Sequence, residues 1–388
     1  MSKLSNMRSS IDLHFTKANS FGNNFIIYDQ SRSQVLTDFQ LRELSGQVTD
    51  QNFGIGADNL LVVEKCNNDT LLRINAESQY WNELPQTEAN YIFRMFEPDG
   101  EEALCCGNGL VCVANYLMNS QGVAQTKILT EIPLDSPKCT SIGSKKYDTS
   151  SWVNLGRPRS LPNEIKVYGS ERKSLGDLQW MQNMKIRFRE HDLQPYSTKT
   201  ELDLSGYLIF TGEPHLVFVI DENSSLPIEL SDAIFANSTS VLGAGPIFRR
   251  RKNTGTWLVE HIGRYLNREY KSIFPIGINV NFVRKNPERG VIEYRCYERG
   301  INKETLACGT GAVAVAYTAK KHFGEQDSEF RVWPHRCRWY KPDAEILVTE
   351  SEEGWTFSGQ PRQVAEGKLT FDWFKDLDKI PNRCAAVV

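Results

Sequence analysis

One stretch of the sequence decides how the chain is organised. Residues 104–114 read Leu104-Cys105-Cys106-Gly107-Asn108-Gly109-Leu110-Val111-Cys112-Val113-Ala114. The pattern returns about half a chain later, where residues 306–316 read Leu306-Ala307-Cys308-Gly309-Thr310-Gly311-Ala312-Val313-Ala314-Val315-Ala316. Upstream of each copy, Arg94-Met95-Phe96-Glu97 resembles Arg295-Cys296-Tyr297-Glu298. These repeats predict a duplicated unit, in which an apolar strand leads through a turn into Cys-Gly-x-Gly at the start of a small-residue helix.

Each Cys-Gly-x-Gly turn has the chemistry of an anion site. Backbone N–H groups in the first turn of a helix have no intrahelical partner, and the helix dipole adds partial positive charge there. Such a helix end binds phosphate or carboxylate groups. The same field favours a thiolate, so we expect the pKa of Cys106 and of Cys308 to fall toward neutrality. The alternative is that both cysteines are buried and pack the helix starts against strands.

Two facing copies of this turn would place two thiols on either side of one small carboxylic acid. That geometry suits removal of a proton from one face of a carbon and delivery of a proton to the other face. A single Cys-Gly-x-Gly turn would favour the packing interpretation. Because the turn is repeated, we favour the catalytic one.

Length and composition narrow the class of protein. A chain of 388 residues suits two domains or one large duplicated domain. The net charge of −3 does not indicate a nucleic-acid or membrane partner, and we interpret the basic run 248–252 as a solvated loop. No apolar run has the length of a membrane helix, and the first residues lack the core of a signal peptide. We therefore expect a cytoplasmic enzyme with a small-molecule partner and no nucleic-acid or membrane partner.

The cysteines support the same assignment. There are nine, an odd number scattered along the chain, which is not the pattern of a disulfide framework. No Cys-x-x-Cys pair has a matching second pair, so we expect no structural zinc site. Free thiols are typical of a reducing compartment.

The remaining patterns predict an α+β fold of mixed sheets. Pro137 to Ser151 is rich in Ser, Lys and Thr and predicts the connection between the halves. We expect helices from the first turn to about Met118, from Thr254 to Tyr270, and from Gly309 to about His322. We expect strands at residues 11–16, 25–29, 60–64, 91–96, 207–210, 215–220, 278–283, 291–297, 345–348, 355–358 and 369–373.

Eight motifs occur in the order found in the diaminopimelate epimerase family, which the chain resembles over roughly residues 13–375. They are Asn19-Ser20-Phe21-Gly22-Asn23-Asn24-Phe25, Gly54-Ile55-Gly56-Ala57-Asp58, Phe96-Glu97-Pro98-Asp99-Gly100, Cys106-Gly107-Asn108-Gly109, Gly212-Glu213-Pro214-His215, Asn279-Val280-Asn281-Phe282, Glu298-Arg299-Gly300 and Glu304-Thr305-Leu306-Ala307-Cys308-Gly309-Thr310-Gly311.

The resemblance implies a fold of two pseudo-symmetric domains, each a curled mixed sheet around a central helix, with the active site in the cleft between them. We expect residues 1–145 to form the first half and residues 146–365 the second. The C-terminal strand, about residues 366–388, would return to the first half. Family members are often dimers, so the resemblance also allows a homodimer.

The resemblance further implies stereoinversion at an α-carbon without cofactor or metal. One cysteine acts as thiolate base and the other as thiol acid, and by position these are Cys106 and Cys308. Cys105 takes a structural role, with its side chain pointing elsewhere. His215 and Glu298 support catalysis, although His215 beside its turn could equally be a base or a satisfied strand-start residue. The residues matched to substrate binding are Asn23, Asn59, Glu97, Gly107, Asn108, Glu213, Asn279, Arg299, Gly309 and Thr310.

Two substitutions separate this chain from the family members that use diaminopimelate. Those members usually carry asparagine at the positions of Glu97 and Glu213, where the distal carboxylate of the substrate is held. Burying two further carboxylates there is costly unless one is protonated or paired. We therefore hypothesise a distal end that is cationic or smaller, as in arginine, lysine, ornithine or histidine. The alternative is that both glutamates turn to solvent or pair with Arg299, which leaves diaminopimelate acceptable.

Two further features bear on this choice. Asn24 replaces the usual aspartate, and a longer 240–275 region could reshape the mouth of the pocket. The competing functions are an isomerase of the phenazine-biosynthesis type on the same fold, which uses a carboxylate in place of the cysteine pair, and a catalytically silent amino-acid-binding protein.

Overall fold

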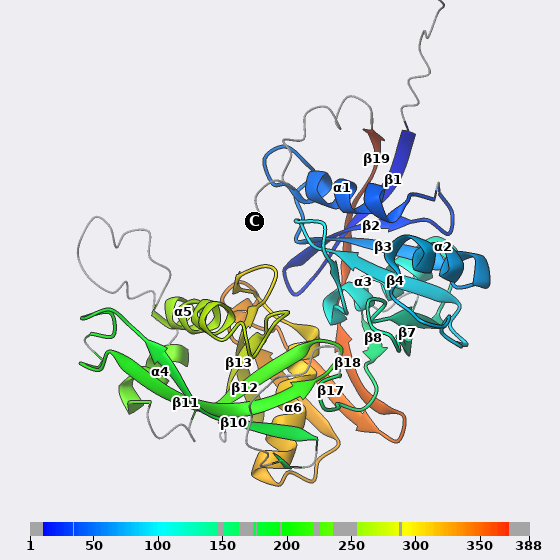
Figure 1. Ribbon diagram of the computed structural model, residues 1–388. Helices are drawn as coiled ribbons and strands as arrows, with labels where there is room; N and C mark the ends of the chain where they lie inside the picture. Colours follow the sequence, from blue (N-terminus) through cyan, green and yellow to red (C-terminus); the bar gives the residue numbers. More distant parts are fainter. Residues whose placement is uncertain are drawn as a thin grey trace, which may run out of the picture.

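The computed structural model of the chain describes residues 11–33, 35–145, 150–162, 174–175, 177–194, 196–220, 226–235, 254–286 and 289–371 (Figure 1). The basic run 248–252 and the first part of the 240–275 region lie outside these residues. In the described part of the chain, no helix is both long enough and apolar enough to cross a lipid bilayer.

The first half of the molecule is a curled mixed sheet. Neighbouring strands are antiparallel except for the β2–β3 and β4–β6 pairs, which are parallel. In spatial order the strands are β1 (Ile11–Ser20), β2 (Asn23–Asp29), β3 (Asn59–Lys65), β4 (Tyr91–Phe96), β6 (Gln125–Thr130), β7 (Lys138–Ser144) and β8 (Ser151–Asn154).

The second half repeats this order and these directions. Its parallel pairs are β12–β13 and β14–β16, at the positions equivalent to those of the first half. The strands are β11 (Glu201–Phe210), β12 (Pro214–Val219), β13 (Asn279–Asn286), β14 (Val291–Glu298), β16 (Glu329–Pro334), β17 (Ile346–Ser351) and β18 (Gly354–Gly359). The predicted α+β fold with two pseudo-symmetric mixed sheets is therefore confirmed, and the duplication extends well beyond the two cysteine turns.

The halves are joined by strand pairing. β8 pairs with β18 in the middle, so all the strands form one continuous sheet. At one edge β19 (Arg362–Phe371) pairs with β1, and at the other β10 (Leu178–Arg187) pairs with β11 and with the short β9 (Ser174–Leu175) (Figure 1). The division at residues 145 and 146 stays a prediction. Within the predicted connection from Pro137 to Ser151, residues 138–144 form β7, and residues 146–149 lie outside the described residues.

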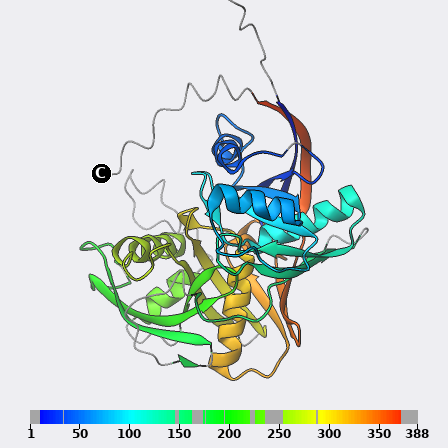
Figure 2. The ribbon, with the colours of Figure 1, turned by 45° about the vertical axis from the view of Figure 1, so that its right-hand side comes forward.

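A helix lies at the centre of each half. α3 (Gly107–Gln121) packs on β1, β7 and β8, and α6 (Gly309–Phe323) packs on β12, β13, β14, β17 and β18. Both helices are apolar nearly all round, as is typical of buried helices. Each ends at a glycine with left-handed backbone, Gly122 at φ 72° and Gly324 at φ 69°. The predicted ends at about Met118 and His322 were therefore close. Figure 2 shows the second half, in green to orange, below the blue and cyan first half.

The other helices cover the outer faces of the sheets. They are α1 (Asp38–Thr49), α2 (Asn68–Ser78), α4 (Ile228–Phe235) and α5 (Thr254–Glu269), with a short 3-10 turn at Cys337–Trp339. The sequence predicted α5, and it missed α1, α2 and α4. A signal for α1 was present, because Thr37 and Gln40 form a capping box at its start.

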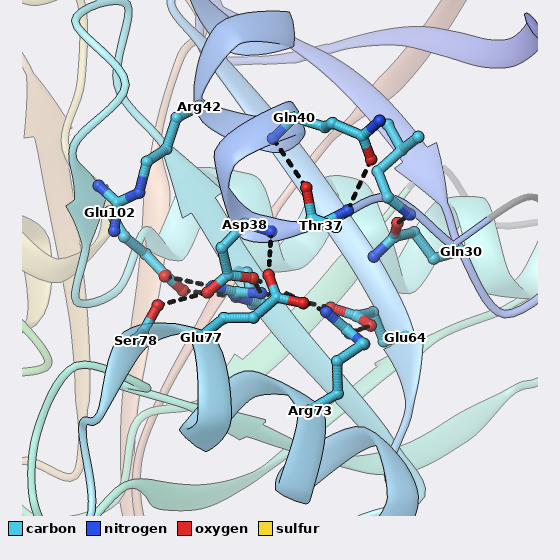
Figure 3. A network of polar contacts seen from close by, with 12 residues as sticks. Gln30, Thr37, Asp38, Gln40, Arg42, Glu64, Arg73, Glu77, Ser78 and Glu102 are labelled. Atoms are coloured by element: carbon cyan, nitrogen blue, oxygen red, sulfur yellow. Dashed lines mark hydrogen bonds and ion pairs between the residues drawn. The ribbon is translucent and has the colours of Figure 1, made fainter.

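A buried arginine–glutamate pair is repeated beneath the two cysteine turns. Arg94 on β4 donates two hydrogen bonds to Glu102 in β5 (Glu102–Ala103), and Arg295 on β14 donates two to Glu304 in β15 (Lys303–Glu304). In the first half Asp38 also binds Arg94, and it lies close to Glu102 and Ser78 in Figure 3. These bidentate pairs fix the strand-to-turn geometry that leads into each cysteine.

Candidate active site

A narrow cavity of about 30 Å³ lies where the two cysteine turns meet. Both cysteines, Glu298 and every residue that the sequence assigned to substrate binding contribute to its wall, whereas His215 does not. The lining residues are Asn23, Asn59, Met95, Glu97, Cys105, Cys106, Gly107, Asn108, Glu213, Asn279, Glu298, Arg299, Ile301, Cys308, Gly309 and Thr310.

The starts of α3 and α6 face each other across this cavity. The ring of Phe357, on β18, contacts Gly107 and Gly309, and a methyl group added to either glycine would overlap it. Asn108 Nδ2 donates to the carbonyl oxygen of Ala307 in the other half at 2.8 Å. The glycines are therefore needed for close approach, and the facing arrangement expected from the repeat is present.

The two cysteines cap their helices in the same way. Cys106 precedes α3, and its Sγ accepts a hydrogen bond from the amide of Gly109 at 3.3 Å. Cys308 precedes α6, and its Sγ accepts from the amide of Gly311 at 3.3 Å. Both residues have extended backbone, as N-cap residues do. Each sulfur therefore lies at the positive end of a helix dipole, beside amides that suit an anion.

The environment of Cys308 favours its thiolate. A hydrogen bond from the Cys296 thiol lowers the pKa of Cys308 most, and hydrogen bonds from Thr310 and from the Gly311 amide act in the same direction against burial. The Thr310 hydroxyl lies 3.3 Å from Cys308 Sγ. Tyr294 holds the backbone of Cys308 in place, because its hydroxyl contacts both the amide and the carbonyl oxygen at 2.9 Å.

The environment of Cys106 favours its thiol instead. Burial raises the pKa of Cys106 well above its usual value, and the nearby Glu298 carboxylate acts in the same direction. The Gly109 amide opposes this effect and does not outweigh it. The expectation that both cysteines have a lowered pKa is therefore wrong for Cys106, because desolvation is larger than the helix-dipole contribution there.

His215 acts through Thr310. It is fully buried on β12, with Nε2 3.0 Å from the Thr310 hydroxyl and Nδ1 3.0 Å from Asn281 Nδ2. With the amide of Asn281 assigned this way, Nδ1 is the acceptor, so Nε2 carries the hydrogen and directs the Thr310 hydroxyl toward Cys308. Burial and the charge of Arg299 lower the pKa of His215 to about 3. A neutral, enclosed imidazole positions a donor and is not a base for the cavity.

At the far end of the cavity, Arg299 forms an ion pair with Glu213. Arg299 Nη2 and Nε lie 2.6 and 3.0 Å from one oxygen of Glu213, and Nη1 donates to the carbonyl oxygen of Ile276 at 2.8 Å. The other oxygen of Glu213 accepts from the amides of Leu104 and Cys105, both at 3.1 Å. Glu213 therefore pairs with Arg299, which is the alternative that the sequence analysis gave for this glutamate.

Glu97 does not turn to solvent. Its Oε2 accepts from Asn59 Nδ2 at 2.8 Å, and its carboxyl group lies against Gly300. Burial raises the pKa of Glu97 to about 8, although the charge of Arg299 works against this rise. Asn279, on the opposite wall, accepts the amide hydrogen of Arg299 at 2.9 Å.

Glu298 ends β14 beside Cys308. Its Oε1 accepts a short hydrogen bond from the Thr305 hydroxyl, and burial raises its pKa well above the usual value. The sulfurs of Cys296 and Cys308 and a carboxylate oxygen of Glu298 all lie within 4.8 Å of one another. Within the described ranges, this is the one group of ionisable side chains with a spacing suited to a metal ion.

Three residues at or beside the cavity were missed from the sequence. Met95 and Ile301 line the cavity, and Cys296 reaches Cys308 from the adjacent strand. The repeat contained a signal for two of these, since it aligns Met95 with Cys296. Cys105 also contributes to the cavity wall, but its sulfur lies against Gly212 and near Thr130, which do not line the cavity, in keeping with a structural role.

Sequence comparison links the chain to one family. A family model described as diaminopimelate epimerase matches residues 15–142. The diaminopimelate epimerase of Archaeoglobus fulgidus is 26% identical over 79% of this chain and 81% of its own length. That of Bacillus subtilis is 27% identical over 78% and 81%, and that of Cupriavidus metallidurans is 25% identical over 95% and 99%.

Solved structures support the fold alone. A hydroxyproline epimerase from Agrobacterium vitis, solved with bound trans-4-hydroxy-L-proline, superposes with a TM-score of 0.55 at 12% identity over 94% of each chain. A methylitaconate-delta-isomerase superposes with a TM-score of 0.51 at 9% identity, over 94% of this chain and 97% of its own. The sequence matches therefore show that the chain is similar to diaminopimelate epimerases and is an isomerase of the amino-acid epimerase and racemase type.

Proposed function

We propose that this enzyme inverts the α-carbon of a free amino acid by a two-base mechanism, with Cys308 as the thiolate base and Cys106 as the thiol acid in one direction. The observation that carries the proposal is the pair of N-cap sulfurs at two facing helix starts around one small cavity. No pyridoxal phosphate or metal takes part in this mechanism.

The helix starts supply the electrostatic part of the mechanism. The α-carboxylate of the substrate binds amides at the first turns of α3 and α6, which stabilise negative charge as the carbanion forms. Asn108 Oδ1, buried in the cavity wall, has no hydrogen-bond partner within the described structure and suits the α-ammonium group. The reacting carbon then lies between the two sulfurs.

Proton transfer follows from the different pKa shifts of the two thiols. The Cys308 thiolate removes the α-proton from one face, and the Cys106 thiol donates its proton to the opposite face. In the reverse direction the roles exchange. His215 and Thr310 maintain the donor that stabilises the Cys308 thiolate.

We further propose that the substrate carries a cationic side chain, in preference to diaminopimelate. Arg299 would be the natural partner of a distal carboxylate, and its charge is already matched by Glu213. A second carboxylate would meet Glu97 and Glu213 with no unmatched cation among the described residues of the wall. An ammonium or guanidinium group would instead be met by Glu97 as that carboxyl loses its proton. Arginine, lysine, ornithine and histidine are the candidates.

Diaminopimelate remains the second candidate because of one observation. The pKa of Glu97 is raised to about 8, so its carboxyl group is largely protonated at neutral pH. A protonated Glu97 could donate a hydrogen bond to a distal carboxylate. An isomerase of the phenazine-biosynthesis type and a silent binding protein are both less consistent with two capping thiols whose pKa values are shifted in opposite directions.

Proton NMR in deuterium oxide tests these proposals. Reduced enzyme is incubated with LL-diaminopimelate and with L-arginine, L-lysine, L-ornithine and L-histidine, and loss of the α-proton signal is followed with inversion. We expect exchange and inversion of a cationic amino acid. Exchange of diaminopimelate alone would overturn the assigned substrate class, and no exchange of any compound would count against the catalytic assignment.

The Glu97→Gln variant tests binding of the distal end of the substrate separately from proton transfer. A hydrogen bond to a charged group contributes about 1.5–3 kcal/mol, so we expect KM for the cationic substrate to rise about 10- to 100-fold with little change in kcat. An unchanged KM would show that Glu97 does not contact the substrate.

The cellular setting is proposed on the same basis. Both thiols must stay reduced, which favours the cytoplasm. The partner is the amino-acid substrate, and a homodimer is consistent with the family.

A further inference from the structure

Three ligand-type side chains converge behind Cys308. Cys296 and Glu298 are two residues apart on β14, so their side chains project from the same face of the strand. Cys308, at the start of α6, meets them from the opposite side. All three ligand atoms lie within 4.8 Å of one another. Cys296 and Cys308 are buried, and Glu298 is partly buried.

This group lacks a positive counter-charge. Glu298 accepts a hydrogen bond from Thr305, and within the described structure no lysine or arginine forms an ion pair with it. Arg299, the next residue, is paired with Glu213. Burial raises the pKa of Cys296 and of Glu298, so these two groups keep their protons beside Cys308, because ionisation of all three would leave uncompensated charge. A divalent cation would supply the missing charge and displace those protons to solvent.

We propose that Cys296, Glu298 and Cys308 bind a thiophilic divalent cation of the Zn²⁺ type, and that this binding inhibits the enzyme by occupying Cys308. Binding is acid–base chemistry only: the ligands lose protons, the metal–sulfur and metal–oxygen bonds form, and nothing is oxidised. The inhibition rests on the proposed role of Cys308, whereas the binding does not.

The donor set selects the metal class. Two thiolates and one carboxylate are ligands that zinc accepts in tetrahedral sites, and thiolates are poor ligands for Mg²⁺ and Ca²⁺. Three protein ligands leave one position open. Cys308 and Glu298 line the cavity, so this position is on the substrate side. Metal and substrate would therefore compete, and substrate would protect the enzyme.

Zinc binding is measured first, by competition with a chromophoric chelator on the full-length reduced chain. We expect one Zn²⁺ per chain. Loss of groups that merely orient metal ligands typically weakens binding 10- to 100-fold, so Cys296→Ala and Glu298→Gln, which remove a ligand, should weaken it by at least about that factor. Cys296→Ser, which keeps the side-chain volume, gives the same comparison if the alanine variant does not fold.

Two controls identify the ligands. Cys112→Ala removes a fully buried thiol of α3 that does not line the cavity, and it should leave zinc affinity unchanged. Cys106→Ser distinguishes the proposed zinc site from an alternative zinc site formed by the facing thiols of Cys106 and Cys308. If zinc affinity depends on Cys106 and not on Cys296, the proposal is wrong, and absence of stoichiometric binding would also overturn it.

The inhibition is tested with the α-proton exchange assay. Zn²⁺ should stop exchange, a chelator should restore it, and Mg²⁺ should have no effect. The concentration of Zn²⁺ for half-inhibition, measured against each variant's own metal-free rate, should rise with Cys296→Ser. Cys296-dependent binding that leaves exchange intact would support the metal site, overturn its inhibitory role and count against Cys308 as the base.

Discussion

The two helix starts share a scaffold and differ in what reaches the sulfur. Cys106 and Cys308 both cap a helix and both accept a hydrogen bond from the amide three residues on. Side-chain donors reach only Cys308 in the described structure, from Cys296 and Thr310. At the equivalent positions in the first half lie Met95, which has no donor, and Asn108, whose amide donates to Asn23 and Ala307.

The two halves also differ in the residue that lies behind the helix start. Phe25 pairs with Asn59 across parallel strands as His215 pairs with Asn279, so the histidine that orients Thr310 is a phenylalanine in the first half. Duplication therefore supplied two equivalent positions for a thiol, and side-chain substitution around one of them made the two thiols chemically unequal.

The largest effect is expected at the cysteines themselves. Cys106→Ser and Cys308→Ser should each reduce inversion by about 10²- to 10⁴-fold, the usual contribution of a general acid or base. In deuterium oxide, Cys106→Ser should still exchange the α-proton of the stereoisomer that faces Cys308. Cys308→Ser should exchange neither stereoisomer near neutral pH, because Cys106 remains protonated. The reverse pattern would assign the base to Cys106.

The next largest effect is expected on stability, from the buried arginine–glutamate ion pairs that are repeated in the two halves. Arg295 has Glu304 as its one carboxylate partner in the described chain and also donates to Thr256 and a carbonyl oxygen, whereas Arg94 has Glu102, Asp38 and, at 3.7 Å, Glu64. Breaking a buried ion pair costs about 3–5 kcal/mol.

We therefore expect Glu304→Gln to lower the free energy of unfolding by about that amount, and Glu102→Gln to lower it by less. Urea unfolding at fixed pH measures both variants. Equal losses would show that Asp38 does not compensate for Glu102.

A smaller effect is expected from the hydroxyl that reaches Cys308. Thr310→Val removes a hydrogen bond to a charged sulfur, which contributes about 1.5–3 kcal/mol. The thiolate is then less favoured and the pKa of Cys308 rises, so the ascending limb of kcat/KM should move to higher pH by about one to two units. Activity at neutral pH falls and recovers at higher pH. Thr310→Ser is the matched control, since it keeps the hydroxyl and should keep the profile.

The smallest effect tests the shared scaffold. Gly122 and Gly324 end the two central helices with positive φ, and a side chain at either position would meet open space. Replacing either by alanine should therefore cost only the left-handed backbone penalty of about 1–2 kcal/mol. Thermal unfolding should give equal losses for the two variants, and clearly unequal losses would show that the repeat is not energetically symmetric.

The architecture could be predicted well from the sequence, because the repeated turns and the strand patterns are visible in short stretches of residues. The two cysteine turns predicted the starts of α3 and α6, and the buried runs predicted β3 and β4 almost to the residue. α1 and α2 were missed because their apolar faces are short. For the candidate site, the matched motifs named nearly all of the residues that line the cavity.

The pKa difference between the thiols could not be predicted from the sequence. A helix-dipole argument treats both starts alike, and it fails at Cys106 because burial there outweighs the dipole. The partners of Cys308 come from β14 and from the helix start, and only the fold brings Cys296 within reach. Likewise, the choice of Glu213 as the partner of Arg299 and the burial of Glu97 depend on how the two halves meet.

The pairing of β19 with β1 has a consequence for how the protein is made. Beyond its seven core strands, the first half has β19 beside β1, and the second half has β10 beside β11, with the short β9 next to β10. β10 precedes its half in the chain, whereas β19 follows every other described strand and completes the half that was synthesised first. On the ribosome, β1 therefore remains an open sheet edge until β19 has emerged, and an open edge is a site for pairing with other chains. The edge strand β10 of the second half is already made when β11 emerges. The two halves of this duplicated enzyme therefore differ in when their sheets can be completed, as they differ in the chemistry of their thiols.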